Sequence, residues 1–527
     1  MQEKVSLFNR VYPVCSRLAD DPTWQDLVGR ADSIETLPDL LQDQAGTLDL
    51  PEFLPELAGL ELHAFKLTNN EIPLPASAEK VTINPTLRLF LNSWKNLAPL
   101  LHGNVVDVHP ERGEEQIIVW LHPFSNIVKA KPVSEEDLLV LKMALEGLSA
   151  RDVAEQGDTY VAAVDGAVIR ALYEGIIIGP QSGIVRDYGE KELSCRDEPL
   201  DAARIFSLQW HITQACDLHC RHCYDREQYA SLPLSQGIHI LDDLADFCAT
   251  HNVHGQITFT GGNPLLHPEF EELYREAADR GFTAAILGNP AAREKIDRIM
   301  AIQPLAFYQV SLEGLEEHND YMRGQGHFQK ILGFLDLLRD IGVYSMVMLT
   351  LTRDNMDQVL ELGEVLRDRV DLFTFNRLSL VGEGASLVMA DPVRYPEFLR
   401  AYVKAVESNP CLGLKDNLLN ILYRQENQEL FGGCTGYGCG AAFNFLSVLA
   451  NGEVHACRKF PSPLGNLVEQ SLHEIYHSDM AKRYRSGPEE CAHCKLRLVC
   501  RGCLAVSYSH GQDIFTTKDP YCFIKDE

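Results

Sequence analysis

The sequence predicts an α/β protein whose central part is a partial (β/α)6 barrel. Between residues 204 and 390, short β-branched or aromatic runs alternate six times with amphipathic helical runs. Alternation of this kind indicates parallel strands joined by crossover helices. A second observation is that each of the first four strand-like runs is followed by a distinctive segment. These segments are the cysteine cluster at 216–223, "TGGNP", "GNP" and "SLEG". Because chemistry in such barrels lies at the carboxyl ends of the strands, we expect these residues to meet at one rim.

The chain has 527 residues and a formal net charge of −28. A chain of that length is too long to fold around a single hydrophobic core, so several domains are expected. The negative charge disfavours nucleic-acid binding. The sequence contains no run of 18 apolar residues, so it predicts no membrane-spanning helix. The N-terminus lacks the apolar core of a signal peptide. We therefore expect a cytoplasmic protein with no membrane or nucleic-acid partner. Four parts are predicted: a helical N-terminal region (1–103), a winged-helix domain with a linker (104–200), the barrel (201–424) and a cysteine-rich domain (425–527).

The winged helix is predicted from its order of elements. Two strands, at 116–121 and 125–129, precede three helices and a short closing strand, "IIIGP". Ser134 and Asp137 form a capping box at the first helix, whose leucines at 138, 141 and 145 have helical spacing. Ser149 and Asp152 repeat the capping device at the second helix.

A winged helix often binds DNA through its third helix, but here that helix carries one basic residue, Arg170, against Asp165 and Glu174. The alternative is that a peptide adds as a strand to the sheet edge. We expect the pair 116–121 and 125–129 to expose such an edge. A groove between this edge and the third helix, with Val168 and Leu172, would select peptide side chains. A role as a spacer is the competing interpretation.

Three cysteines, Cys216, Cys220 and Cys223, crowd into "CDLHCRHC" directly after the first barrel strand. A structural zinc site usually has four protein ligands, and a disulfide uses cysteines in pairs. A four-iron cube bound by three thiolates keeps one iron open for a ligand that is not protein. A partial zinc site is the alternative.

This spacing, with His222 in the aromatic position, resembles the signature of the radical S-adenosylmethionine (SAM) superfamily. The resemblance implies a TIM-like radical SAM barrel with a [4Fe–4S] cluster on these three cysteines. In that family the methionine part of SAM chelates the open iron, and an electron from the cluster cleaves the sulfonium. The resulting 5′-deoxyadenosyl radical abstracts a substrate hydrogen. A reductant such as ferredoxin or flavodoxin is implied.

Further segments resemble the same family. "TGGNP" at 260–264 is similar to its Gly-Gly-Glu-Pro loop, except that an asparagine replaces the usual glutamate. The glycines there let the backbone approach the cofactor. "SLEG" and "YMRGQGHF" are similar to the family's ribose and carboxylate contacts. The resemblance thus implies a set of SAM-binding residues: His222, Gly261, Gly262, Asn263, Ser311, Glu313 and Arg323.

Eight further cysteines lie in the last hundred residues. Their CxxC pairs alone suit a zinc ribbon. The full arrangement resembles the SPASM extension of radical peptide maturases, with two residues rather than three between Cys500 and Cys503. The resemblance implies two auxiliary [4Fe–4S] clusters, and three clusters in all. One would be held by Cys434, Cys439, Cys457 and Cys503, and the other by Cys491, Cys494, Cys500 and Cys522. Because no auxiliary iron is then left open, we expect an electron-relay role.

Together these features resemble maturases of ribosomally made, post-translationally modified peptides. The wording around "GGNP", "CTGYGC" and "CRKFPSPLGN" resembles the thio(seleno)oxazole-modification (selenobiotic-type) family. The resemblance implies a precursor peptide held by the winged helix and modified at Cys or selenocysteine, by thioether or thio(seleno)oxazole chemistry. One alternative is formylglycine formation, as in anaerobic sulfatase maturases, but Arg458 stands where those enzymes place an aspartate base. The non-enzyme alternative is an Fe–S winged-helix regulator, which the barrel motifs disfavour.

Overall fold

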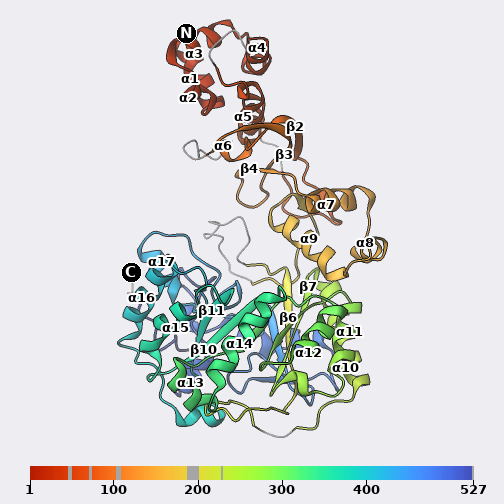
Figure 1. The fold of residues 1–527 in the computed structure, drawn as a ribbon, viewed down its shortest axis with the longest axis vertical. Helices are drawn as coiled ribbons and strands as arrows, with labels where there is room; N and C mark the ends of the chain where they lie inside the picture. Colours follow the sequence, from red (N-terminus) through yellow and green to blue (C-terminus); the bar gives the residue numbers. More distant parts are fainter. Residues whose placement is uncertain (45–49, 70–73, 102–107, 187–200, 227–228, 525–527) are drawn as a thin grey trace. The chain divides into compact units, whose positions relative to one another are not determined.

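A computed structural model describes residues 1–44, 50–69, 74–101, 108–186, 201–226 and 229–524. The chain forms two compact units (Figure 1). The first contains the described residues of 1–152 together with 166–181. The second contains 153–165, 182–186 and the described residues from 201 onward.

The first unit begins with a helical bundle around buried Phe8, Leu27 and Leu57. Its helices are α1 (Gln2–Val11), α2 (Cys15–Leu18), α3 (Asp21–Arg30), α4 (Leu37–Asp43), α5 (Leu54–Asn69) and α6 (Ala98–Leu101). The N-terminal region, which was expected to be mostly helical, also contains two strands, β1 (Thr82–Ile83) and β2 (Arg88–Lys95). Their β-branched and aromatic residues are few, so the sequence carried little strand signal.

An antiparallel sheet in the order β2–β3–β4 follows, with β3 at Glu111–Leu121 and β4 at Val128–Pro132. Because β2 belongs to this sheet, the predicted boundary at 103/104 cuts through it. Three helices come next, namely α7 (Glu135–Glu146), α8 (Ala150–Gly157) and α9 (Val161–Tyr173), and β5 (Ile177–Ile178) pairs with β1.

Strand β3 is buried on both faces. Ile117 and Val119 pack into the core of the helical bundle, whereas Ile118 and Trp120 pack with residues of α7 and α9. A strand covered on both sides reads as a continuous apolar run, which explains "IIVWL". Of the strand pair that was expected to expose an edge, β3 lies between its neighbours and exposes none, whereas β4 is an outer strand of this sheet, as is β2.

Helix α7 has the predicted capping box, in which the Asp137 N–H donates to Ser134 Oγ at 3.1 Å. Its apolar face differs from the expected one. Leu138 and Leu145 are exposed, and Val140 and Met143 are buried instead. Leucine spacing alone therefore misidentified the covered side of this helix.

The second unit is built on one nine-stranded sheet in the order β11–β10–β9–β8–β7–β6–β12–β13–β14. Six parallel strands in consecutive order form the predicted partial barrel. They are β6 (Ile205–Thr213), β7 (His254–Gly261), β8 (Thr283–Leu287), β9 (Tyr308–Ser311), β10 (Ser345–Leu351) and β11 (Leu372–Arg377).

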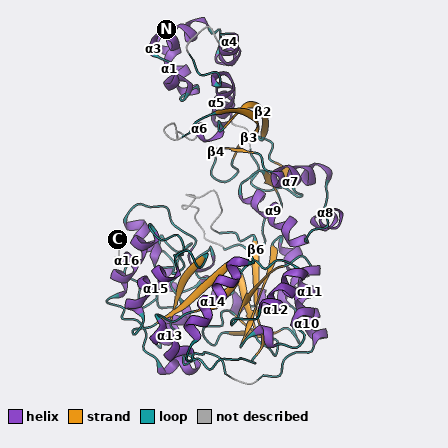
Figure 2. Ribbon diagram, viewed as in Figure 1, coloured by secondary structure: helices purple, strands orange, loops and turns teal. Residues whose placement is uncertain are grey.

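Helices lie outside these strands, as Figure 2 shows. They are α10 (Leu234–His251), α11 (Phe270–Asp279), α12 (Arg293–Ile302), α13 (Glu316–Arg323), α14 (His327–Asp340), α15 (Val359–Leu366), α16 (Tyr395–Val406) and α17 (Leu419–Gln425). Helices α12 and α13 were not predicted from the sequence. Within the described residues, no helix is both long and apolar enough to cross a bilayer.

The cysteine-rich region continues the barrel sheet. Strand β12 (Phe445–Val448) pairs in parallel with β6, and β13 (Glu453–His455) and β14 (Pro463–Asn466) follow antiparallel. The remaining helices are α18 (Leu472–His477), α19 (Asp479–Ser486) and α20 (Leu504–Ser509). The predicted boundary at 424/425 thus separates two parts that share one sheet.

A buried ion network joins the last barrel strand to this region. Arg377, at the end of β11, donates to Asp416 at 2.8 Å and to both carboxylate oxygens of Asp519 at 2.7 and 2.9 Å. The side chains of Arg377 and Asp519 are 2% and 1% exposed. Asp519 also accepts the N–H of Cys503 at 2.8 Å. The network therefore fixes one cysteine of the C-terminal region against the barrel.

Replacing Arg377 by methionine should destabilise the protein by about 3–5 kcal/mol, because two buried carboxylates lose their partner. Anaerobic denaturant unfolding followed by circular dichroism measures this. Arg394→Met is the matched control, since Arg394 pairs with Asp357 at the surface and should leave the unfolding midpoint unchanged. Equal midpoints for the two variants would contradict a structural role for the network.

Candidate active site

The three cysteines of "CDLHCRHC" lie in the loop that follows β6. Cys216 is exposed, and Cys220 and Cys223 are partly buried. Burial raises the pKa of Cys220 and of Cys223, and the neighbouring thiol of Cys216 raises both further. Thiolates gathered in this way need a nearby cation, which a metal ion or cluster provides.

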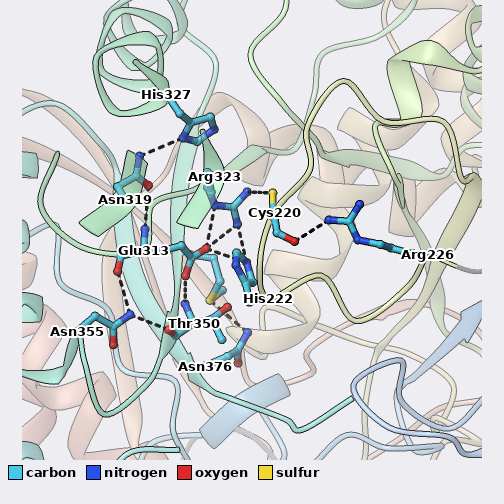
Figure 3. A network of polar contacts seen from close by, with 11 residues as sticks. Cys220, His222, Arg226, Glu313, Asn319, Arg323, His327, Thr350, Asn355 and Asn376 are labelled. Atoms are coloured by element: carbon cyan, nitrogen blue, oxygen red, sulfur yellow. Dashed lines mark hydrogen bonds and ion pairs between the residues drawn. The ribbon is translucent and has the colours of Figure 1, made fainter. Parts of the chain in front are cut away.

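Positive and N–H groups of the protein point at this loop (Figure 3). Arg323 Nη1 lies 3.7 Å from Cys220 Sγ, and Asn289 Nδ2 lies 3.6 Å from Cys216 Sγ. Arg226 donates from Nη2 to the Cys220 carbonyl at 2.7 Å. Donors around the sulfurs stabilise thiolate charge and tune a bound iron–sulfur cluster.

Glu313 is the centre of the polar network in Figure 3. It follows β9 and its side chain is 1% exposed. Its Oε1 accepts from Arg323 at 3.0 and 2.5 Å and lies 3.2 Å from His222 Nε2. Burial opposes ionisation of Glu313, but His222 and Arg323 hold the pKa of this carboxyl well below its ordinary value. Glu313 is therefore a buried anion that positions Arg323 and His222 beside the cysteine loop.

Three neighbouring residues hold Glu313 in place. The Thr350 N–H donates to Glu313 Oε2 at 2.8 Å, and Asn355 Nδ2 donates to its carbonyl at 2.9 Å. The Glu313 N–H donates to Asn319 Oδ1 at 3.1 Å. These contacts come from β10, from the segment after it and from α13. Of the three residues carried over from "SLEG" and "YMRGQGHF", Glu313 thus has the most contacts. Ser311 ends β9 at the same rim and is partly exposed.

The glycines of "TGGNP" make room for protein backbone. A Cβ on Gly261 would lie 2.2 Å from the Thr213 carbonyl oxygen, and one on Gly262 would lie 2.3 Å from that of Ala215. The Gly262 N–H donates to Thr213 O at 2.8 Å. These contacts fix the root of the cysteine loop against the end of β7. The close approach seen here is to that loop, and the expected approach of a cofactor stays a prediction.

Asn263 is buried and faces a carboxylate that the sequence analysis did not consider. Its Nδ2 donates to Asp217 Oδ1 at 3.1 Å, and Asn289 Nδ2 donates to the same oxygen at 2.6 Å. Burial opposes the charge, but the two amides hold the pKa of Asp217 below its ordinary value. Asp217 is visible as the second residue of "CDLHC", yet only the fold shows that it meets Asn263.

A second buried ion pair links the loop to the cysteine-rich region. Arg458 pairs with Asp225, and its guanidinium lies 5.4 Å from the ring centre of Tyr224. Both partners directly follow Cys223. Arg458 is therefore a structural cation, and it offers no base at this position.

The eight C-terminal cysteines lie around two cavities. One cavity is lined by Cys434, Cys439, Cys457 and Cys503. The other is lined by Cys491, Cys494, Cys500 and Cys522. Burial and neighbouring thiols raise the pKa of Cys439 to about 12, of Cys457 to about 11 and of Cys491 to about 12. Each cavity thus gathers one of the two cysteine sets that the resemblance implies.

Two family models match the chain. Residues 210–366 match the radical SAM superfamily, and residues 439–503 match the SPASM iron-sulfur cluster-binding domain. The AdoMet-dependent heme synthase of Methanosarcina barkeri is 24% identical, over 60% of this chain and 96% of its own length. The subtilosin biosynthesis protein AlbA of Bacillus subtilis is 23% identical, over 54% of this chain and 63% of its own.

A solved structure shares the fold. Streptococcus suis SuiB bound to its precursor peptide SuiA is 17% identical, with a TM-score of 0.50 over 78% of this chain and 96% of that chain. Residues 204–527 make up only about three fifths of the chain, so this match also includes residues before the barrel. The described geometry and the two family models lead to one conclusion: the chain is an enzyme that contains a radical SAM domain followed by a SPASM domain.

Proposed function

We propose that the enzyme is a maturase that modifies a ribosomally made precursor peptide. The observation that carries this proposal is the first unit. The heme synthase relative spans 96% of its own length on 60% of this chain, so about two fifths of this chain have no counterpart in that enzyme. Both family models match residues of the second unit, and the first unit lies outside them. A tethered peptide substrate gives this unit a use, and SuiB was solved with such a peptide bound.

In the proposed enzyme, Cys216, Cys220 and Cys223 hold a [4Fe–4S] cluster. Bound together, the cluster and SAM supply one-electron chemistry that makes an organic radical. Arg323 and Arg226 offset the negative charge of the thiolates. Asp217 and Asn263 present a carboxylate and an amide beside the loop, and this pair suits the ammonium group of SAM. The Asp217 carboxylate thereby supplies the negative charge that a glutamate would carry at the position of Asn263.

Each C-terminal quartet of thiols is proposed to hold one further [4Fe–4S] cluster. With four cysteines to each cube, every iron has a protein ligand, so substrate does not bind there. The proposed role is electron transfer between the active site and an external reductant such as ferredoxin or flavodoxin. Zinc bound by the same thiols is the competing possibility, and iron analysis distinguishes the two.

The proposed target is a Cys or selenocysteine of the peptide, giving a thioether or thio(seleno)oxazole-type product. Support for this finer point comes from the resemblance of "GGNP", "CTGYGC" and "CRKFPSPLGN". Formylglycine formation is disfavoured, because Arg458 is paired with Asp225 and cannot remove a proton. Tetrapyrrole chemistry is the second candidate, favoured by the heme synthase relative. It predicts that deleting the first unit leaves turnover intact.

The proposed docking element for the peptide is the outer edge of β4. At one end of this strand the Val133 N–H donates to Gln116 O at 2.8 Å, and at the other end the His122 N–H donates to Ile127 O at 2.9 Å. Bonded and non-bonded pairs alternate along an antiparallel ladder. Every second residue of β4 therefore points its N–H and C=O toward β3, and the residues between them point outward.

By this alternation the N–H groups of Lys129 and Lys131 face β3, and that of Val128 points away from it. Pro132 has no N–H to offer. An extended peptide can add here as a further strand. Val168 and Leu172 on α9 are partly buried in the adjoining core and are proposed to line the groove beside this edge.

Replacing Cys216, Cys220 and Cys223 together by alanine should abolish reductive formation of 5′-deoxyadenosine from SAM. Iron content should fall from about twelve to about eight atoms per chain, because two of three cubes remain. Anaerobic metal analysis and product chromatography measure both values. Turnover at the wild-type rate in this variant would remove the basis of the proposal. An iron content near four in the wild type would favour zinc in the C-terminal quartets.

Asp217→Asn should weaken SAM binding about 10- to 100-fold, the loss expected for one charge-assisted hydrogen bond. Equilibrium binding to the reconstituted enzyme measures the dissociation constant without relying on turnover. Asp246→Asn, on the exposed side of α10, is the control and should bind SAM normally. If both variants bind equally well, Asp217 is only a support for the cysteine loop.

Val128→Pro should reduce affinity for the precursor peptide at least tenfold, because it removes a donor of β4 that points away from β3 while the β3–β4 ladder keeps its bonds. Leu91→Pro is the matched control on β2, where the same alternation turns the N–H outward from the opposite edge. Fluorescence anisotropy with a labelled precursor peptide measures affinity, and peptide-free SAM cleavage should survive in both variants. A loss confined to Leu91→Pro would move the docking edge to β2.

A further inference from the structure

Three histidines meet at the end of the barrel opposite the cysteine loop. His251 is the last residue of α10, three positions before β7 begins, whereas the cysteines follow the carboxyl end of β6. His473 and His477 lie on α18. One ring nitrogen from each of the three lies within 4.8 Å of the others. We propose that these histidines bind a divalent transition-metal ion.

Local structure fixes the two histidines of α18. They are four residues apart, so they share one face of the helix. The capping box of Ser471 and Glu474 begins α18, and the Leu472 N–H donates to Asp243 of α10 at 2.6 Å. Both helices are thereby held together before any metal is bound, which is the preorganisation that a metal site requires.

The hydrogen bonds of His251 leave one nitrogen available for coordination. Its Nδ1 lies 2.8 Å from the Phe247 carbonyl oxygen. A carbonyl only accepts, so Nδ1 carries the proton and Nε2 of the neutral ring has a lone pair. That Nε2 lies 2.9 Å from His477 Nε2. Nδ1–H bound to a backbone carbonyl is the usual outer contact of a metal-binding histidine.

The spacing fits coordination after a small outward movement. Zinc binds imidazole nitrogen at about 2.0–2.1 Å in a tetrahedral site, which separates two ligand nitrogens by about 3.3 Å. The 2.9 Å contact of His251 and His477 is slightly shorter than this, and the three ligand nitrogens all lie within 4.8 Å of one another. His473 and His477 are exposed, so a water molecule can take the fourth position.

Two nearby cations oppose a bound ion, but each has another contact. Lys482 pairs with Asp479, and Arg485 donates to the carbonyls of Ala442 and Tyr476.

A metal ion at this place ties helix α10 of the radical SAM domain to helix α18 of the C-terminal region. Its ligands are all nitrogen, and imidazole suits zinc, copper, nickel and iron. The site is separate in both position and ligand type from the thiol-lined centres. It therefore adds a structural cross-link between the two helices.

The test uses the full chain with its complete iron content and Zn2+ as the probe. Equilibrium dialysis with metal analysis should show one zinc per chain and unchanged iron. X-ray absorption at the zinc edge should show a nitrogen or oxygen shell at about 2.0–2.1 Å, not sulfur at about 2.3 Å. Zinc should also raise the unfolding temperature.

His473→Ala and His477→Ala should each weaken zinc binding at least tenfold and remove the gain in unfolding temperature. Both side chains are exposed, so the variants should fold and cleave SAM as the wild type does. His239→Ala, an exposed histidine on the same helix as His251, should bind zinc normally. A sulfur shell, binding retained in the double variant, or no binding at micromolar zinc would each overturn the proposal.

Discussion

Thiols in a protein interior resist ionisation, and this constraint organises most of the second unit. Burial raises the pKa of cysteines in all three groups. These buried thiols become thiolates only if cations lie beside them. The protein supplies some of that charge itself, with Arg323 near Cys220. The remaining positive charge must come from bound metal, so metal binding and folding of these regions are coupled.

Arginines are the connecting elements between regions that are distant in sequence. Arg377 and Arg458 each pair with buried carboxylates across the barrel and the cysteine-rich region. Arg186 donates to the Cys439 carbonyl at 2.5 Å and stacks on Phe443. A planar guanidinium can bridge two acceptors and an aromatic face at once, which lysine cannot do. In a chain of net charge −28, a few buried arginines therefore hold together segments that are distant in the sequence.

The parts of the fold that were predictable are those with a repeating local signal. Six strand–helix units and the capping box at Ser134 follow from periodicity and from side-chain chemistry within a few residues. The spacing of the cysteines likewise carries its own chemistry. What the sequence did not reveal depends on pairing between distant segments. Strand β2 joins β3 across a long connection, and the partner of Asn263 proved to be Asp217. The burial of Val140 in place of Leu138 depends on what covers α7, which no local pattern encodes.

The parallel pairing of β12 with β6 has a consequence for how the chain is made. Phe445 pairs with Ser207, so one edge of β6 has no partner strand until roughly 240 further residues have been synthesised. Until then β6 presents an open edge flanked by apolar side chains, and open strand edges favour association between chains. Non-local pairing also slows folding. Nascent chains of this enzyme therefore pass through a long aggregation-prone interval, and translation rate and chaperone supply should limit its yield more than the stability of the finished fold does.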